Sequence, residues 1–159
     1  MKILLNNNSL FRALRPYNDV GFVPTMGSIH EGHLSLIERS NRTCKKTIVS
    51  IFVNPKQFNN KKDFKNYPTN IKEDIKILKK TKKVDFLYIP KFKDVYNNNK
   101  KSNIKITKKN KILCAKFRKG HFEGVLDVME RLTNLVNPKK IFMGKKAVSY
   151  THLRAHETP

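Results

Sequence analysis

A strand, a turn and a helix follow one another near the start of the sequence, and this order narrows the possible folds more than any other feature. Val20–Val23 is a short apolar run that predicts a buried strand. Pro24 and Gly27 follow as breakers, and His33–Cys44 then has the apolar spacing of a helix. A strand that leads through a short turn into a helix is the building unit of a parallel sheet covered by helices.

The same alternation of strand-like and helix-like segments continues along the chain. Because strands joined by helices pair in parallel through right-handed crossovers, we predict an α/β fold with a Rossmann-like parallel sheet and flanking helices. Asn54–Pro68 is polar and broken by prolines, which predicts a loop. The other expected strands are Thr47–Val53, Asp85–Ile89, Ile104–Ile106 and Ile141–Met143, and the other expected helices are a short one capped by Ser9, Asn70–Lys80 and Gly124–Val136.

Three polar segments directly follow predicted strands. They are Pro24–His33, Asn54–Phe58 and Gly144–Lys146. Because ligands of open parallel sheets bind at the carboxyl ends of the strands, we expect these distant segments to line one crevice.

The 159 residues, of which 38% are hydrophobic, are enough for a single domain with a core of its own.

The first of these segments contains two histidines, His30 and His33, on either side of Gly32. At the start of a helix the first backbone N–H groups have no partner within the helix, and the helix dipole favours an anion there. Two imidazoles beside such a helix end can donate hydrogen bonds to phosphate oxygens, and a glycine between them lets a nucleotide approach the backbone. Taken alone, however, a pair of histidines at this spacing is more often ordinary polar surface.

The net charge of +22 comes from 34 Lys and Arg against 12 Asp and Glu, a balance typical of nucleic-acid-binding proteins. The lysines, however, occur in short groups along almost the whole chain, so they indicate no single basic face. They accompany many Asn, Ile, Phe and Tyr residues, which AT-rich codons favour, and this bias explains the charge without a nucleic-acid partner. We therefore expect no specific nucleic-acid binding, while a positive field suits anionic ligands.

Nothing in the sequence indicates a membrane or an oxidising compartment. No unbroken apolar run approaches membrane-spanning length, and the apolar stretch near the N-terminus is too short for a secretory signal. Cys44 and Cys114 form no metal-ligand spacing and are expected to remain free thiols. We therefore expect a cytoplasmic protein without a membrane partner.

Four ordered blocks of the sequence resemble one known enzyme family, the pantothenate synthetases, or pantoate–β-alanine ligases. P-T-M-G followed by H-x-G-H is the family's first signature, although H-x-G-H alone identifies only the wider nucleotidyltransferase superfamily. The remaining blocks are similar to the family's in order and in spacing. The four are Pro24–His33, Ser50–Phe58, Tyr67-Pro68 with Glu73-Asp74, and Arg118–Val125.

The resemblance implies a class-I-synthetase-like nucleotidyltransferase fold and a two-step ligation. The carboxylate of pantoate would attack the α-phosphate of ATP, which gives a pantoyl adenylate and releases pyrophosphate. The amine of β-alanine would then open the adenylate to pantothenate and AMP. ATP is thus an expected substrate, accompanied by Mg²⁺ for which no ligand is assigned, and the full-length protein is expected to form a homodimer.

The resemblance also assigns roles to individual residues. His33 is expected to carry the main catalytic role, with His30 holding phosphate and Lys146 offsetting negative charge. Gln57 is the expected ligand of pantoate and β-alanine, because a neutral amide can both donate and accept hydrogen bonds. The expected ATP-binding residues are Met26, Gly27, Ser28, Ile29, His30, Glu31, Gly32, His33, Gly144, Lys146 and Arg118.

The resemblance covers roughly residues 1–146, little more than the first half of a family member. We expect 1–146 to form a truncated nucleotide-binding domain, the C-terminal family domain to be absent, and 147–159 to be a non-native or disordered tail. Gly144–Ala147 reads G-K-K-A where the family has G-E-K-D, which puts catalysis by this chain in doubt. Two alternatives stay open: another H-x-G-H nucleotidyltransferase, and an inactive basic fragment that binds nucleic acid non-specifically.

Overall fold

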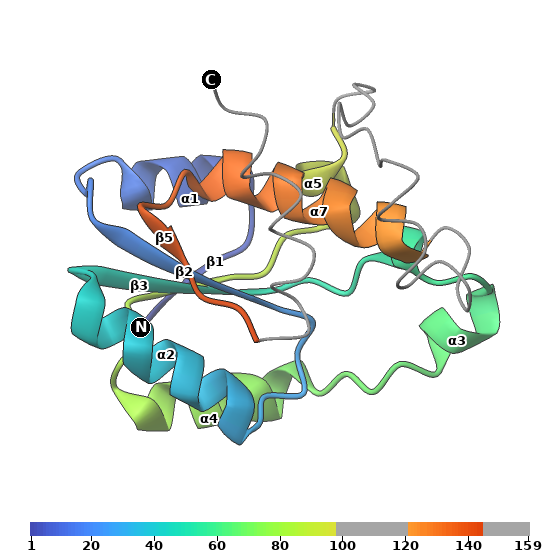
Figure 1. Ribbon diagram of the computed structural model, residues 1–159, viewed down its shortest axis with the longest axis horizontal. Helices are drawn as coiled ribbons and strands as arrows, with labels where there is room; N and C mark the ends of the chain where they lie inside the picture. Colours follow the sequence, from blue (N-terminus) through green and yellow to red (C-terminus); the bar gives the residue numbers. More distant parts are fainter. Residues whose placement is uncertain (98–120, 145–159) are drawn as a thin grey trace, which may run out of the picture.

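The computed structural model describes residues 1–97 and 121–144, and its centre is a five-stranded parallel sheet (Figure 1). The strands lie in the order β1-β4-β3-β2-β5, and every pairing between neighbours is parallel. The prediction of a parallel α/β sheet is therefore confirmed. The strands are β1 (Lys2–Leu4), β2 (Val20–Thr25), β3 (Lys46–Ile51), β4 (Phe86–Tyr88) and β5 (Lys140–Ile141).

Helices cover both faces of the sheet, so that the molecule has three layers. In Figure 1, α1, α5 and α7 lie above the sheet and α2 and α4 below it, while α3 lies beyond its right-hand end. The helices are α1 (Asn7–Leu14), α2 (Glu31–Thr43), α3 (Lys61–Lys65), α4 (Ile71–Thr81), α5 (Phe92–Val95) and α7 (His121–Val136), with a short 3₁₀ helix η1 (Pro55–Gln57).

The apolar side chains form two cores, one on each face of the sheet. Phe22 and Ile48 belong to the core under α1 and α7, and Val23 and Val49 belong to the core against α2 and α4. All four side chains are fully or almost fully buried. Successive side chains of a strand point to opposite faces, so a strand covered on both sides must be apolar throughout. This is why Val20–Val23 reads as a continuous apolar run.

Pro24 does not end the strand that precedes it, contrary to its predicted role as a breaker. It lies inside β2 and pairs with Ser50 of β3. The carbonyl of Phe22, two residues earlier, accepts a hydrogen bond from Phe142 N–H on the β5 side, and the pairing with β5 ends at this point. Backbone groups two residues apart point the same way, so Pro24 faces past the end of β5. Its missing N–H therefore costs no ladder hydrogen bond.

Other predicted elements are confirmed with shifted ends. The helices expected over His33–Cys44, Asn70–Lys80 and Gly124–Val136 are present as α2, α4 and α7, and the strands expected over Thr47–Val53, Asp85–Ile89 and Ile141–Met143 are present as β3, β4 and β5.

Three predictions need correction. The strand β1 was missed, because three residues are too few for periodicity to show. Ser9 is not the cap of α1: Asn6 caps the helix, and Ser9, at the third helical position, completes a capping box with it. The loop expected over Asn54–Pro68 contains η1 and α3. The strand expected over Ile104–Ile106 lies outside the described residues, as does Cys114, while Cys44 is a buried free thiol.

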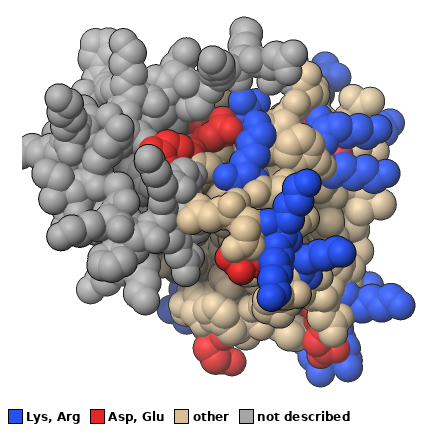
Figure 2. Space-filling view, turned by 90° about the vertical axis from the view of Figure 1, so that its right-hand side faces the viewer, with Lys and Arg blue, Asp and Glu red and all other residues tan. Residues whose placement is uncertain are grey.

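The edge of the sheet at the carboxyl ends of the strands has many basic side chains. Figure 2 looks at this side of the molecule, and Lys and Arg spread over the right half of the view with uncharged and single acidic residues between them. Helix α3 contributes the exposed Lys61, Lys62 and Lys65 on this side. None of the helices in the described ranges has the length and apolar character needed to span a bilayer.

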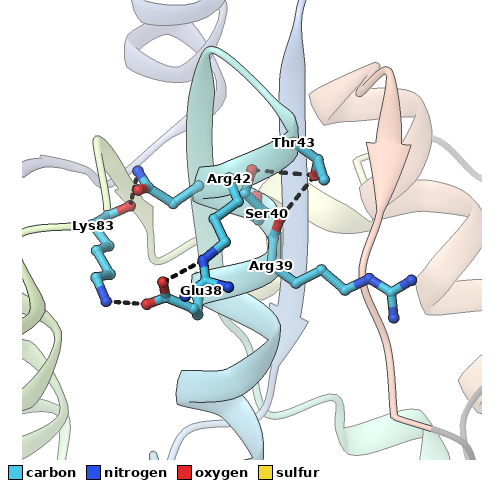
Figure 3. A network of polar contacts seen from close by, with 7 residues as sticks. Glu38, Arg39, Ser40, Arg42, Thr43 and Lys83 are labelled. Carbon is cyan, nitrogen blue, oxygen red and sulfur yellow. Dashed lines mark hydrogen bonds and ion pairs between the residues drawn. The ribbon is translucent and has the colours of Figure 1, made fainter.

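A polar network fixes the second half of α2 against the chain that follows α4 (Figure 3). Glu38 accepts a hydrogen bond from Arg42 Nε at 2.8 Å and a second from Lys83 Nζ, and the bond from Lys83 lowers the pKa of the Glu38 carboxyl. Asn41 Nδ2 donates to the carbonyl of Lys83 at 3.3 Å. These contacts fix the C-terminal half of α2. The first turn of the same helix lies at the other end, next to the carboxyl end of β2.

Candidate active site

The topology places a switch point at the carboxyl end of β2. This strand lies between β3 and β5. Helix α2, which leads from β2 to β3, lies below the sheet, whereas α7, which leads into β5, lies above it (Figure 1). In open α/β sheets the crevice at such a point is where ligands bind. The residues that follow Thr25 are therefore the first candidates for a site.

The side chain of Thr25 ties the loop after β2 to the neighbouring strand β3. Thr25 Oγ1 donates to the carbonyl of Ser50 at 2.7 Å and accepts from Gly27 N–H at 3.2 Å. Gly27 and Ser28 both have positive φ values, 85° and 51°. A Cβ at Gly27 would lie 2.9 Å from Oδ2 of Asp74, so both the backbone conformation and the space require glycine at this position.

The carboxylate of Asp74, in the first turn of α4, closes the same loop from the other side. Its Oδ2 accepts a hydrogen bond from Ser28 N–H at 3.0 Å, and its Oδ1 accepts one from Ile29 N–H at 2.8 Å. Asp74 is buried, with 3% of its surface exposed. The sequence offered no sign of this role beyond the resemblance of the block that contains Asp74.

His30 caps the helix that carries the second histidine. Its Nδ1 accepts a hydrogen bond from Gly32 N–H at 3.1 Å, which leaves the ring proton on Nε2 in the neutral form. A Cβ at Gly32 would lie 2.8 Å from Cε1 of His30. The absence of a side chain at Gly32 thus allows the His30 ring to form this cap.

The rings of His30 and His33 face each other at the start of α2. Their centroids are 4.0 Å apart and their planes are tilted by 36°. His33 is half-buried, and its Nδ1 is enclosed without a hydrogen-bond partner among the residues that the structure describes. Burial lowers the pKa of His33, His30 lowers it further, and Asp74 opposes the shift. His33 is therefore neutral at pH 7, with one ring nitrogen able to accept a proton.

Gln57 lies beside this loop although it belongs to η1, after the neighbouring strand. It is 7% exposed, and its Nε2 donates a hydrogen bond to Sδ of Met26 at 2.7 Å. This contact joins the segments after β2 and β3. The two segments, which the sequence predicts to lie together at the carboxyl ends of the strands, are therefore in contact.

Asn54 holds η1 in place, and sequence reasoning did not single it out. Its Nδ2 donates to the carbonyl of Gly124 at 3.0 Å and to Oε1 of Gln57 at 3.4 Å. Its Oδ1 accepts from the Tyr96 hydroxyl at 3.0 Å and from Lys56 N–H at 3.2 Å. Asn54 is 1% exposed, so these partners replace water at a buried amide.

The remaining predicted site residues are not joined to this cluster by any described contact. Glu31 is exposed, and Gly144 follows β5 with nothing within 4 Å of a Cβ placed there. Arg118 and Lys146 lie outside the described residues.

The parallel sheet and the histidine pair define this chain as a Rossmann-like protein of the H-x-G-H nucleotidyltransferase class. The model of the family described as pantoate-beta-alanine ligase matches residues 4–153. The chain therefore belongs to the pantoate-beta-alanine ligase family, as its sequence blocks indicated.

Individual relatives agree with the family match. The chain is 43% identical over 135 residues to the pantothenate synthetase of Pseudothermotoga lettingae, which covers 85% of this chain and 48% of that protein. It is 48% identical over 128 residues to the pantothenate synthetase of Leptospira interrogans, covering 80% of this chain and 45% of that protein. The chain thus spans about half the length of the curated relatives it matches.

A solved structure shows the same fold. It is the pantoate-beta-alanine ligase of Francisella tularensis complexed with beta-gamma ATP and beta-alanine. The TM-score is 0.89 at 36% sequence identity, and the match covers 98% of this chain and 61% of that one.

Proposed function

We propose that this chain supplies the nucleotide-binding part of a ligase that joins pantoate and β-alanine at the expense of ATP. The observation that carries the proposal is the contact between Met26 and Gln57, because it brings the loop of the histidine pair against the amide of η1. The related Francisella protein holds an ATP compound and β-alanine, which supports the same ligands here.

In the first step, an oxygen of the pantoate carboxylate attacks the α-phosphorus of ATP and pyrophosphate leaves. Two anions must meet, so the site needs donors that act on the phosphate oxygens. His30 has its Nδ1 occupied by Gly32 N–H, and its Nε2–H is the group free to donate to phosphate. His33 is neutral, so it adds a second N–H donor without a fixed charge. By family resemblance, Lys146 and Arg118 bring positive charge to the same phosphates.

In the second step, the amine of β-alanine attacks the acyl carbon of the adenylate and AMP leaves. The attacking amine must lose a proton, and a neutral imidazole with a pKa below its usual value is suited to accept it. His33 is assigned this role because its burial keeps it neutral.

Gln57 is assigned to the acid substrate. Its amide offers a donor and an acceptor to a hydroxyl and a carboxylate, and Asn54 fixes its orientation through the 3.4 Å contact to Oε1.

Magnesium is assigned to the substrate as MgATP. Across 1–97 and 121–144 no three His, Cys, Asp or Glu residues gather in a way that could hold a metal ion. Both oxygens of Asp74 already accept backbone hydrogen bonds. Mg²⁺ bound to ATP phosphates keeps most of its waters, so the donors found here suit a metal carried by the nucleotide, and no step is assigned to it.

The remaining assignments follow from the family. We propose a cytoplasmic protein whose full-length form is a homodimer, with no specific nucleic-acid partner. The positive edge of the sheet in Figure 2 suits ATP and pantoate, which are both anions.

Equilibrium binding of ATP tests the proposal directly, because the proposal assigns nucleotide binding to this part of the family. We expect saturable ATP binding by the 159-residue chain, weakened at least about tenfold by His30→Ala or His33→Ala, since a charge-assisted hydrogen bond contributes about 1.5–3 kcal/mol. Arg39→Ala, an exposed change on the same helix, is the matched control. Absence of ATP binding, or equal binding by all variants, would contradict the proposal.

A further inference from the structure

Asp74 joins two segments that are 45 residues apart in the sequence and that no strand pairing connects. It lies in the first turn of α4, where the helix dipole stabilises a carboxylate. Both of its oxygens accept hydrogen bonds from the loop that leads into α2. A buried carboxylate with two N–H donors is a strong, directional contact.

The loop at this point holds an anion with two of its backbone N–H groups. Gly27 and Ser28 are consecutive residues with positive φ, and the N–H groups of Ser28 and Ile29 point to one place. The anion in that place is the protein's own carboxylate. These two N–H groups are therefore already used and do not serve a phosphate.

The residues fixed by Asp74 lie directly before the histidine pair. Ile29 is buried in the core below the sheet, and His30, the next residue, caps α2. The direction in which α2 starts, and with it the placement of both imidazoles, follows from this anchored loop.

We propose that Asp74 is a positioning residue that holds the Ser28–Ile29 backbone and thereby sets the His30–His33 pair for its ligand. The proposal rests on the assignment of this pair to the ATP site. It gives Asp74 a role through the loop and not through direct contact with the nucleotide.

The pKa of His33 can be measured to test this proposal, because a general loss of stability does not by itself change it in a defined direction. Among the described residues, His30 and Asp74 are the titratable groups that act on His33. Asp74 raises the pKa of His33, whereas burial and His30 lower it. Removing the Asp74 charge must therefore lower the pKa of His33 further.

The test compares Asp74→Asn with Glu73→Gln, which removes an equal charge from the neighbouring, exposed position of α4. Asp74→Asn is expected to lower the His33 pKa, measured by NMR titration of the ring, and to shift the amide signals of Ser28 and Ile29. Glu73→Gln is expected to leave all three unchanged. In Asp74→Glu, which retains a carboxylate, the pKa of His33 is expected to lie between its values in Asp74→Asn and in the unsubstituted protein.

ATP binding separates this inference from the proposed function. Asp74→Asn is expected to weaken ATP binding about tenfold or more, since misplacement of a site by about 1 Å costs up to 10²-fold. Tighter ATP binding by Asp74→Asn would mean that the carboxylate only repels the nucleotide, and it would overturn the inference. Unchanged Ser28 and Ile29 amide signals would overturn it as well. If the unsubstituted chain binds no ATP while the NMR changes occur, the proposed function fails and the anchoring by Asp74 stands.

Discussion

The rings of His30 and His33 lie 4.0 Å apart, centroid to centroid, at the N-terminal end of α2. Two imidazolium groups at this distance would repel each other, and burial of His33 adds a penalty for its charged form. His33 is therefore held in its neutral form at pH 7. On the proposed function, this neutral ring is the group that accepts a proton from the β-alanine amine.

Stability is expected to depend on pH through His33. Its pKa in the folded protein lies below the usual value near 6.5, so the unfolded chain binds more protons between the lowered pKa and about 6.5. Stability must therefore fall as pH decreases through this window and level off below the folded pKa. Denaturant unfolding at a series of pH values is expected to show this slope, and His33→Gln is expected to reduce it. An identical slope in both proteins would show that His33 ionises as freely when folded as when unfolded.

Gly32→Ala is expected to weaken ATP binding with little change in stability. The new Cβ would lie 2.8 Å from Cε1 of His30, and the ring, as a movable side chain, would rotate away and lose the cap. Loss of a cap costs about 1 kcal/mol, while replacing a helical glycine by alanine returns about 0.5–1 kcal/mol. Thermal unfolding and ATP titration of the same samples check both parts. Unaltered ATP affinity would mean that the position of the His30 ring does not matter.

Gly124→Ala is expected to destabilise the protein by about 1–3 kcal/mol through overpacking. A Cβ there would lie 2.6 Å from the carbonyl oxygen of Lys56 and 2.8 Å from Cα of Gln57, and backbone atoms cannot move aside cheaply. Helix α7 would be pushed away from η1, so Gln57 would also shift. Gly144→Ala, where nothing lies within 4 Å, is the control for packing and is expected to leave the stability unchanged. Equal stability of both variants in urea unfolding would refute the close packing of α7 on η1.

Tyr96→Phe is expected to weaken pantoate binding through Asn54. The variant removes the O–H that Asn54 Oδ1 accepts at 3.0 Å and leaves a buried amide less well paired, at a cost of about 1–3 kcal/mol. Tyr17→Phe, at an exposed tyrosine, serves as the control. Pantoate titrations measure the change in affinity, and denaturant unfolding measures the change in stability. Equal pantoate affinity of both variants would show that Tyr96 does not support the pantoate site through Asn54.

The central strands and helices were predictable because their signals are local. Val20–Val23 and Thr47–Val53 are apolar throughout, as strands covered on both faces must be. The strand end predicted at Pro24 was wrong, because β2 can contain a proline only at a position where the pairing with β5 has already ended. The start of α2 was placed two residues late because histidine is an unusual cap, and its capping role depends on the glycine two residues later.

The candidate site was predictable only in part. His30, His33 and Gln57 stand in recognisable motifs, and the structure brings the histidine loop and Gln57 together. Asp74 and Asn54 gain their roles from partners 45 and 70 residues away, and no local pattern reports such contacts. Residue types that are common on surfaces, such as Asp and Asn, reveal a buried structural role only once the tertiary fold is known.

The most direct test of the account is the binding of ATP and of pantoate by the 159-residue chain, each measured by titration. We expect both ligands to bind, and we expect His33→Ala to weaken ATP binding and Gln57→Ala to weaken pantoate binding at least about tenfold, the loss that follows when a hydrogen bond to a charged group is removed. Arg39→Ala should leave both affinities unchanged. ATP binding that survives the loss of His33, or pantoate binding that survives the loss of Gln57, would contradict the assignment of this cluster to the two substrates.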